Sequence, residues 1–216
     1  MELIARLAAE VADLNRGADR VLVGIDGPDA AGKSTVADRL ARALTAAVRV
    51  SADEFQHPPE VRYRRGDLSP EGCYRDTFDY PALLRTCLEP FRAGAAHIAV
   101  RRPASETVAV PVRAVLVVDG VFLLRPELRD QWTFSIHLAI SPAETLRRAR
   151  VRDLDRFGSP AEVERRYAQR YLPAHALYVA EAEPEARADV VVDNEVVSAP
   201  VVRRWPGDGA VRRSAG

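Results

Sequence analysis

The chain has 216 residues, of which 47% are hydrophobic and 29% charged, enough for one α/β domain with a core of its own. Lysine plus arginine and aspartate plus glutamate both number 31, so no net charge draws the chain to nucleic acid or to an anionic membrane. Cys73 and Cys87 have neither metal-ligand spacing nor the pattern of a disulfide framework. No stretch has the composition of a signal peptide or the length of a membrane span, so we expect a soluble cytoplasmic protein.

After an amphipathic helix predicted over residues 3–14, the segment 21–35 reads V-L-V-G-I-D-G-P-D-A-A-G-K-S-T and predicts a buried strand, a phosphate-binding loop and a helix. It fits G-x-x-x-x-G-K-[ST], in which backbone N–H groups surround phosphates, the lysine reaches the terminal phosphates and the hydroxyl ligates Mg²⁺. A glycine-rich turn without nucleotide is the alternative. We expect ATP, or GTP, together with Mg²⁺. The residues expected to contact the nucleotide here are Gly27, Asp29, Ala30, Ala31, Gly32, Lys33, Ser34 and Thr35.

Two further strands are predicted to deliver an acid. Residues 47–51 form a short strand followed by Asp53, and residues 114–119, A-V-L-V-V-D, form a buried strand that ends at Asp119. In open α/β sheets ligands bind beyond the carboxyl ends of the strands, so both acids should face the crevice that holds Lys33. Asp119 is the expected Mg²⁺ partner beside Ser34. Asp53 either accepts or orients the proton of an incoming hydroxyl, or caps a turn.

Residues 54–113 are predicted to form an insertion on the substrate side of the domain. Residues 56–72 are rich in proline, arginine and glycine and predict a loop, a kind of segment that often carries substrate contacts. Residues 74–92 resume a helical pattern, in which Asp79 is either a helix N-cap or a substrate ligand. Residues 97–113 alternate in two short runs and predict a β-hairpin.

An arginine-rich helix is predicted over residues 142–156, after a strand over residues 134–140. Arg148, Arg152 and Arg156 are four residues apart and share a face. Such arginines either pair with nearby acids in solvent or form a lid, here about residues 147–160, that neutralises charge as a phosphoryl group moves. A second helix follows from residue 161, and residues 188–192 predict a final strand. We expect residues 1–202 to form one domain and residues 203–216 to form a flexible tail.

The alternation of strands and helices predicts a parallel sheet with helices on both faces and the phosphate-binding loop at its centre. Phosphoryl transfer requires in-line positioning, Mg²⁺, cations on the equatorial oxygens and an acid near the attacking hydroxyl. The expected crevice supplies these parts from Lys33, Ser34, Asp53, Asp119 and the arginine-rich helix. The sequence therefore predicts an enzyme that transfers a phosphoryl group.

Several motifs occur in the order known from one family. The runs G-I-D-G-P-D-A-A-G-K-S-T, S-A-D-E-F, F-D-Y-P, V-V-D-G-V-F, R-x-x-x-R-D and A-D-V-V-V-D-N lie between about residues 21 and 194. Together they resemble the uridine kinase branch of the phosphoribulokinase and uridine kinase family of P-loop kinases. The resemblance implies an ATP- and Mg²⁺-dependent kinase with a P-loop NTPase fold. It also implies that Asp53 is the catalytic aspartate, that Asp79 holds ribose hydroxyls, and that Arg148 and Arg152 are lid residues at the phosphates.

The expected site residues therefore fall into four groups. The catalytic group comprises Lys33, Asp53, Arg148 and Arg152, and the metal group comprises Ser34 and Asp119. Arg156 and Asn194 join the nucleotide contacts. The substrate group comprises Asp53, Gln56, His57, Arg64, Asp79, Tyr80, Arg101 and Arg166.

The small-molecule acceptor has three interpretations, because the chain departs from the family pattern in two places. Gln56 stands where the family has tyrosine, and the hairpin run V-R-R-P-A-S-E-T lacks the aromatic segment that contacts the pyrimidine. Uridine or cytidine, converted to its 5′-monophosphate, is the first expectation. The second is an alcohol that carries an anion, such as a sugar phosphate or a pantothenate-like compound, held by Arg62, Arg64, Arg65, Arg101 and Arg102. The third is a regulatory NTPase without a small acceptor. A homo-oligomer is compatible with each interpretation.

Overall fold

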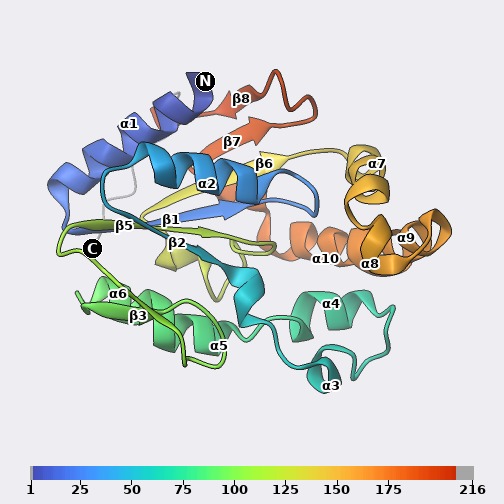
Figure 1. Ribbon diagram of the computed structural model, residues 1–216. Helices are drawn as coiled ribbons and strands as arrows, with labels where there is room; N and C mark the ends of the chain where they lie inside the picture. The colour runs from blue at the N-terminus through green and yellow to red at the C-terminus, as the bar shows by residue number, and fades with distance from the viewer. Residues whose placement is uncertain (1, 208–216) are drawn as a thin grey trace.

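A six-stranded sheet forms the centre of the structure, a computed structural model that describes residues 2–207 (Figure 1). The strands lie in the order β2-β5-β1-β6-β7-β8, in which the first five pair in parallel and β8 runs antiparallel to β7. The predicted α/β fold with a mostly parallel sheet is confirmed. The strands are β1 (Arg20–Asp26), β2 (Ala47–Ser51), β5 (Ala114–Asp119), β6 (Phe134–Ala139), β7 (Val190–Asp193) and β8 (Val201–Arg204).

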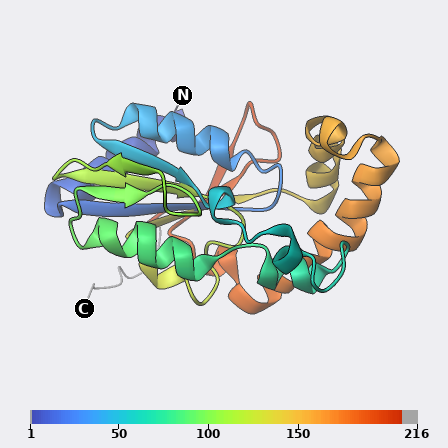
Figure 2. The ribbon, with the colours of Figure 1, turned by 60° about the horizontal axis from the view of Figure 1, so that its bottom comes forward.

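Helices cover both faces of this sheet (Figure 2). Residues 21–25 of β1 carry no polar side chain: Val21, Val23 and Ile25 belong to the core on one face, and Leu22 belongs to the core on the other. Successive side chains of a strand point to opposite faces, so a strand covered on both sides needs apolar residues at every position. The helices are α1 (Glu2–Gly17) and α2 (Lys33–Ala43) on the first face, and α5 (Tyr80–Leu83), α6 (Glu89–Arg92) and α10 (Leu172–Ala182) on the second.

The insertion between β2 and β5 contains more helix than the sequence predicts. Residues 56–72 were expected to be a loop, but Pro59 and Pro70 occupy the first turns of two short helices, and the Ser69 hydroxyl accepts a hydrogen bond from the Gly72 N–H (3.0 Å). The predicted hairpin is confirmed as a separate two-stranded sheet. The elements of the insertion are η1 (Ala52–Phe55), α3 (Pro59–Arg62), α4 (Pro70–Asp76), α5, η2 (Leu84–Leu88), α6, β3 (His97–Ala99) and β4 (Thr107–Ala109).

The arginine-rich segment, residues 142–157, is two helices and not the single helix that was predicted. The first begins after Ser141, whose hydroxyl accepts a hydrogen bond from Glu144 N–H (3.1 Å), and it ends at Asp153. The Asp153 carboxylate binds the side chains of Arg152 and Tyr167, which fixes this residue outside helical geometry. The remaining elements are α7 (Pro142–Arg152), α8 (Leu154–Phe157), α9 (Pro160–Arg166), the π-helical turn η4 (Tyr167–Tyr171), α11 (Pro184–Arg187) and η3 (Arg129–Gln131).

The chain after residue 202 corrects the prediction of a flexible tail at its first residues. Arg203 and Arg204 belong to β8, and Trp205 is buried, with the guanidinium of Arg6 stacked 3.8 Å from its ring centre. Residues 208–216 of the expected tail lie outside the described residues. Within residues 2–207, no helix is both long enough and apolar enough to cross a membrane.

Candidate active site

The loop after β1 folds tightly around two glycines. Gly27 has φ 149°, and a Cβ on it would lie 2.5 Å from the carbonyl oxygen of Leu138. Gly32 has φ 92° and begins α2, where a Cβ would lie 3.1 Å from Asn194 Nδ2. Both positions require glycine for conformation and for space. The loop therefore presents the first N–H groups of α2, which a helix cannot satisfy internally, as an anion-binding site.

Lys33 and Ser34 lie in the first turn of α2. The Lys33 ammonium donates a hydrogen bond to the carbonyl of Pro28 in the same loop (2.7 Å). The Ser34 hydroxyl donates to Asp119 Oδ2 at the end of β5 (2.6 Å), and the other carboxylate oxygen of Asp119 lies 2.8 Å from Arg49 Nη1. The first turn of α2 and the end of β5 thus bring a hydroxyl and a buried carboxylate into direct contact.

The oxygens of Ser34 and Asp119 fit Mg²⁺, a hard cation that prefers oxygen ligands. Within residues 2–207, no group of three or more His, Cys, Asp or Glu side chains is arranged to hold a metal ion. A pair of oxygen ligands supplemented by nucleotide phosphates is the usual way in which proteins hold Mg²⁺, so the donor set suits a metal that arrives with the nucleotide.

Asp53 follows β2 in the turn η1. The hydroxyl of Ser51 caps this turn by accepting a hydrogen bond from the N–H of Asp53 (3.4 Å), which leaves the carboxylate of Asp53 free to face the cavity. Desolvation beside the cavity wall raises the pKa of Asp53; nearby Lys33 opposes the rise, and the charges of Asp29 and Asp119 add to it. Asp53 is thus an acid with a raised pKa close to the Lys33 ammonium.

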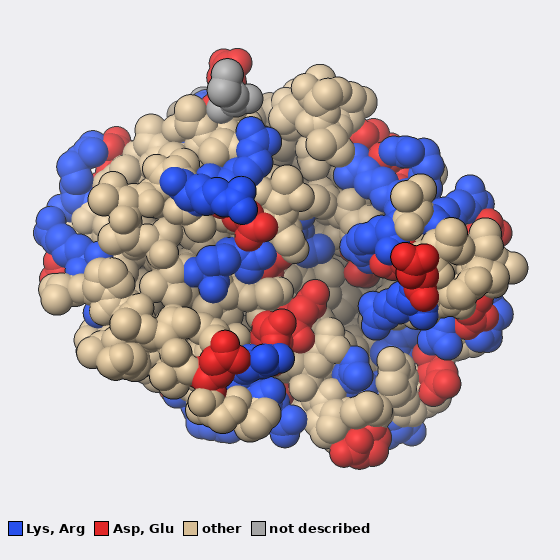
Figure 3. Space-filling view, viewed as in Figure 1, with Lys and Arg blue, Asp and Glu red and all other residues tan. Residues whose placement is uncertain are grey.

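These groups border one cavity of about 330 Å³ between the sheet and the arginine-rich segment, where Figure 3 shows a hollow flanked by basic side chains. Of the predicted residues, the structure brings to it Asp29, Lys33, Ser34, Asp53, Gln56, Arg62, Asp119, Arg152 and Arg156. The sequence prediction of the site missed other lining residues, which are Tyr63, Cys73, Thr77, Phe78, Gly120, Val121, Phe122, Asp153, Arg170 and Tyr171.

Arg152 and Arg156 reach the cavity, and Arg148 does not. Arg152 binds Asp153 through two hydrogen bonds (2.7 and 2.9 Å) and lies 3.7 Å from Asp29 in the phosphate-binding loop. Arg148 points to the back of that loop, although it shares a helical face with Arg152 in the sequence. The prediction of Arg148 as a residue at the phosphates is therefore not supported by its position.

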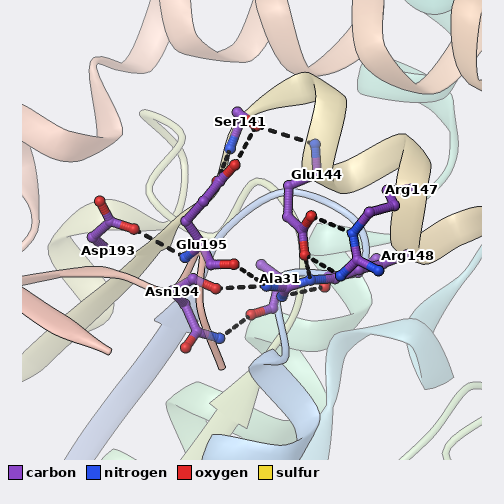
Figure 4. Close-up of polar contacts among 9 residues, drawn as sticks. Ala31, Ser141, Glu144, Arg147, Arg148, Asp193, Asn194 and Glu195 are labelled. Atoms are coloured by element: carbon purple, nitrogen blue, oxygen red, sulfur yellow. Dashed lines mark hydrogen bonds and ion pairs between the residues drawn. The ribbon is translucent and has the colours of Figure 1, made fainter. Parts of the chain in front are cut away.

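Figure 4 shows what Arg148 contacts instead. Its guanidinium donates hydrogen bonds to the carbonyls of Ala30 (3.2 Å), Asn194 (2.6 Å) and Glu195 (3.1 Å). Asn194 in turn donates from its side chain to the carbonyl of Ala31 (2.7 Å). Arg148 and Asn194 thus join the arginine-rich segment, the phosphate-binding loop and the segment after β7. Ala30 itself has φ 59°, a left-handed conformation that these contacts help to hold.

A second hollow of about 500 Å³ adjoins Arg148 and shares no lining residue with the cavity. Its apolar surface comes from Val196 and Val197, which are 56% and 64% exposed. Glu144 and Arg147 form its opposite border. The hollow is therefore a partly apolar surface next to the phosphate-binding loop.

Three predicted substrate residues are held elsewhere by ion pairs. Arg64 pairs with Asp76. Arg101, on the hairpin, pairs with Glu54 (3.0 Å). Arg166 pairs with Glu162 (2.6 Å). None of the three arginines lines the cavity. Each is held away from it by an acid that is distant in the sequence or lies on the same helix face.

The other predicted substrate residues near Asp79 also lie off the cavity. Asp79 caps α5 by accepting a hydrogen bond from Ala82 N–H (2.9 Å), so its N-cap interpretation is confirmed. His57 lies 3.8 Å from the same carboxylate. Tyr80 is buried in the core beneath the guanidinium of Arg125 (4.5 Å). Thr35, expected at the nucleotide, is exposed on α2 and does not line the cavity.

Comparison with known proteins places this site in a family. No protein-family model matches the chain. The chain is 31% identical over 188 residues to a uridine kinase of Proteus mirabilis, covering 79% of this chain and 85% of that protein. It is 29% identical to the uridine kinase of Escherichia coli K12, over 80% of this chain and 86% of that one. Its fold matches the structure of a possible uridine kinase from Bacillus stearothermophilus with a TM-score of 0.68 and 23% identity, over 88% of this chain and 99% of that one.

The similarity to the Proteus mirabilis enzyme extends over most of both chains. The structure adds the strand-end acids and the arginine pair that border a single cavity. Sequence, fold and site agree, and the chain belongs to the uridine kinase branch of the phosphoribulokinase and uridine kinase family, as a phosphotransferase with an alcohol group as acceptor.

Proposed function

We propose that this protein is an ATP- and Mg²⁺-dependent kinase that transfers the γ-phosphoryl group to a hydroxyl of a small molecule. The observation that carries the proposal is that Asp53 faces the same cavity as Lys33 and the Ser34–Asp119 pair. An acid opposite a phosphate-binding lysine is what an alcohol acceptor requires and what a nucleotide switch without an acceptor does not. This arrangement favours a kinase over the regulatory NTPase.

Each group has a distinct part in the proposed reaction. Lys33 leaves the carbonyl of Pro28 and binds the terminal phosphates, while Arg152 at the end of α7 and Arg156 on the lid helix α8 neutralise the equatorial oxygens. The acceptor oxygen forms a bond to the γ-phosphorus as the bond from that phosphorus to the β–γ bridging oxygen breaks. The hydroxyl proton passes to Asp53, and ADP leaves. Mg²⁺ held at Ser34 and Asp119 supplies charge neutralisation at the phosphates.

The nucleoside half of ATP has a natural position in the second hollow. Val196 and Val197 offer an apolar surface to the base, and Arg148 with Asn194 fixes the edge of that hollow against the phosphate-binding loop. A nucleotide in this orientation passes its phosphates over Gly32 toward the cavity. The contacts of Arg148 and Asn194 thus suit a positioning role for the loop.

Uridine and cytidine are the first acceptors to consider, because the relatives of this chain are uridine kinases. An alcohol that carries an anionic group is the second candidate. The observation that favours it is the presence in the cavity of Arg62 and of the buried Arg170.

The test is release of ADP from ATP and Mg²⁺ in the presence of nucleosides, sugar phosphates and small hydroxy acids. We expect ADP release to depend on one class of added alcohol, and we expect Lys33→Ala to weaken ATP binding measured by calorimetry. Arg39→Ala, which removes an exposed cation from the same helix, is the matched control. ADP release that no alcohol stimulates, or ATP affinity unchanged in Lys33→Ala, would contradict the proposal.

A further inference from the structure

Two arginines on the acceptor side of the cavity have only neutral partners among the described residues. Arg170 is 3% exposed, and its Nη1 donates hydrogen bonds to the carbonyls of Asp67 (3.2 Å) and Ser69 (3.3 Å). Arg62 contacts the side-chain oxygen of Gln56, and its buried Nε has no hydrogen-bond partner. A buried charge requires an opposite charge or complete hydrogen bonding, and the described residues provide neither here.

The two guanidinium groups lie over the same aromatic ring. Arg62 stacks 5.3 Å and Arg170 5.0 Å from the ring centre of Tyr63. The negative face of the Tyr63 ring stabilises a cation in part, but the two guanidinium groups near this ring also repel each other. An anion between them would remove the repulsion and complete the hydrogen bonding of both.

Three other arginines near this part of the chain are in ion pairs. Arg64 and Arg65 both bind the carboxylate of Asp76, which is buried. Arg102 binds Asp79 (2.7 Å). Arg62 and Arg170 thus differ from these arginines, because both line the cavity and neither is in an ion pair with a described residue.

The carboxylate that the resemblance assigns to ribose hydroxyls is not available in this cavity. The resemblance assigns the ribose hydroxyls to Asp79, but one carboxylate oxygen of Asp79 binds Arg102 and the other accepts the N–H of Ala82. Asp79 does not line the cavity. An acceptor in this cavity meets cations where the nucleoside interpretation requires an acid.

The position of Arg170 depends on the shape of the chain around it. It lies in the π-helical turn η4, and its side chain reaches the carbonyls of Asp67 and Ser69, which directly precede α4. Such turns in helices are frequent at functional sites. The rings of Tyr63 and Tyr171 flank the guanidinium and hold it at the cavity.

Taking the proposed kinase function as its basis, we infer that the acceptor is a small hydroxy compound with a carboxylate or phosphate group, and that Arg170 and Arg62 bind this anion. The planar guanidinium fork matches both anions through paired hydrogen bonds. With its anion on these arginines, the acceptor leaves its hydroxyl on the side of the cavity lined by Asp53 and Lys33. Arg170 and Arg62 then determine specificity, and Asp53 handles the proton.

The test compares pairs of compounds that differ only by the anionic group, bound to the ADP-loaded protein. The pairs are glycerate and glycerol, ribose 5-phosphate and ribose, and pantothenate and pantothenyl alcohol, with uridine added. Calorimetry should show at least one anionic member binding about tenfold or more tightly than its neutral partner. The identity of that pair distinguishes a carboxylate from a phosphate.

Variants then assign the preference to residues. Arg170→Gln and Arg62→Gln should each remove most of the difference in affinity between the anionic and the neutral member of the preferred pair. Each should also raise the KM of the anionic member about tenfold or more, with the KM of ATP unchanged. Arg170→Lys, which keeps the positive charge, should retain part of this difference in affinity. It also covers the case in which the glutamine variant does not fold. Arg165→Gln is the matched control, because Arg165 is an exposed arginine on α9 paired with Glu162.

Equal affinity for both members of every pair, or no binding of any anionic member, would overturn the inference. Turnover of uridine that Arg170→Gln leaves unchanged would overturn it too, while the proposed kinase function would stand. Failure of the kinase proposal has a separate sign, which is ADP release that no alcohol stimulates even though an anionic member binds through Arg170.

Discussion

Asp26 Oδ2 lies 2.7 Å from Nδ1 of His137, across the two central strands and directly before the phosphate-binding loop. The same carboxylate oxygen accepts a hydrogen bond from the Tyr178 hydroxyl (2.8 Å), and the other oxygen accepts the N–H of Leu123 (3.0 Å). Asp26 is fully buried, so these bonds compensate the loss of water around its charge. They join β1, β6, α10 and the turn after β5 behind the site.

Replacing Asp26 tests this network. Burial favours the neutral acid, but the hydrogen bonds and the charge of His137 outweigh burial and lower the pKa of Asp26. We expect Asp26→Asn to reduce the free energy of unfolding by about 2 kcal/mol, because the amide has one acceptor oxygen where the buried carboxylate has two, and part of the network loses its hydrogen bonds. Urea denaturation at neutral pH measures this. Asp13→Asn, on the exposed part of α1, should change it by less than about 0.5 kcal/mol; an equal effect of the two variants would contradict the role of the network.

His175 on α10 predicts how stability depends on pH. Burial lowers the pKa of His175 from 6.5 to about 4, because a charged imidazole there would lose its water. The unfolded chain therefore takes up a proton at a higher pH than the folded one, and stability should fall as the pH falls from 6.5 to about 4, by roughly 3 kcal/mol at most. His175→Gln should flatten this part of the stability–pH curve. His97→Gln, at an exposed position, should leave the curve as it is, and a curve equally steep in His175→Gln would refute the assignment.

Asp53 predicts how turnover depends on pH. Its raised pKa means that the carboxylate becomes available as a base only above the ordinary pKa of aspartate, so kcat/KM should rise with pH through that raised value. Asp53→Asn should lower kcat by about 10²- to 10⁴-fold and remove this rise, with ATP affinity nearly unchanged. Steady-state kinetics from pH 4 to 8 provide the measurement. Glu54→Gln, next in the chain, serves as control, and full turnover by Asp53→Asn would exclude Asp53 as the base.

Arg148 and its neighbour Arg147 allow a matched comparison. Both bind Glu144, but only Arg148 reaches the carbonyls of Ala30 and Asn194. Arg148→Ala should weaken ATP binding by about tenfold, because the loop loses hydrogen bonds to a charged donor worth about 1.5 kcal/mol or more. Arg147→Ala should weaken ATP binding less than Arg148→Ala does, because Arg147 borders the second hollow but makes no contact with the loop. The two variants should be compared by calorimetry at one ionic strength; the same affinity in both would show that the contacts of Arg148 do not support the loop.

The parts of the site that could be predicted from sequence are those whose geometry is local or follows from the sheet. Lys33 and Ser34 follow from the loop pattern, and Asp53 and Asp119 follow from the rule that the ends of parallel strands meet at one edge. The fold class follows from the alternation of elements. None of these conclusions required a contact between distant segments to be known in advance.

Arg170 could not be found in this way, because its position at the cavity depends on contacts with residues about 100 positions earlier in the chain. The sequence shows one arginine among many, and only folding places it under the carbonyls of Asp67 and Ser69. Arg64 was wrongly expected at the substrate for the converse reason, since folding gives it a partner in Asp76. In a chain rich in arginine, which cations are neutralised is a tertiary property. Trp205 was missed likewise, because its partner Arg6 lies at the other end of the chain.

The interruption at Asp153 divides the arginine-rich segment mechanically. Arg148, before it, is fastened to the main chain of the phosphate-binding loop, whereas Arg156, after it, has its guanidinium over Phe157 of its own short helix. We therefore expect a closing movement to rotate α8 about Asp153 while α7 stays bound to the loop. Amide exchange should accordingly be slow in α7 and faster from Leu154 onward, and it should slow there when nucleotide and acceptor are both bound.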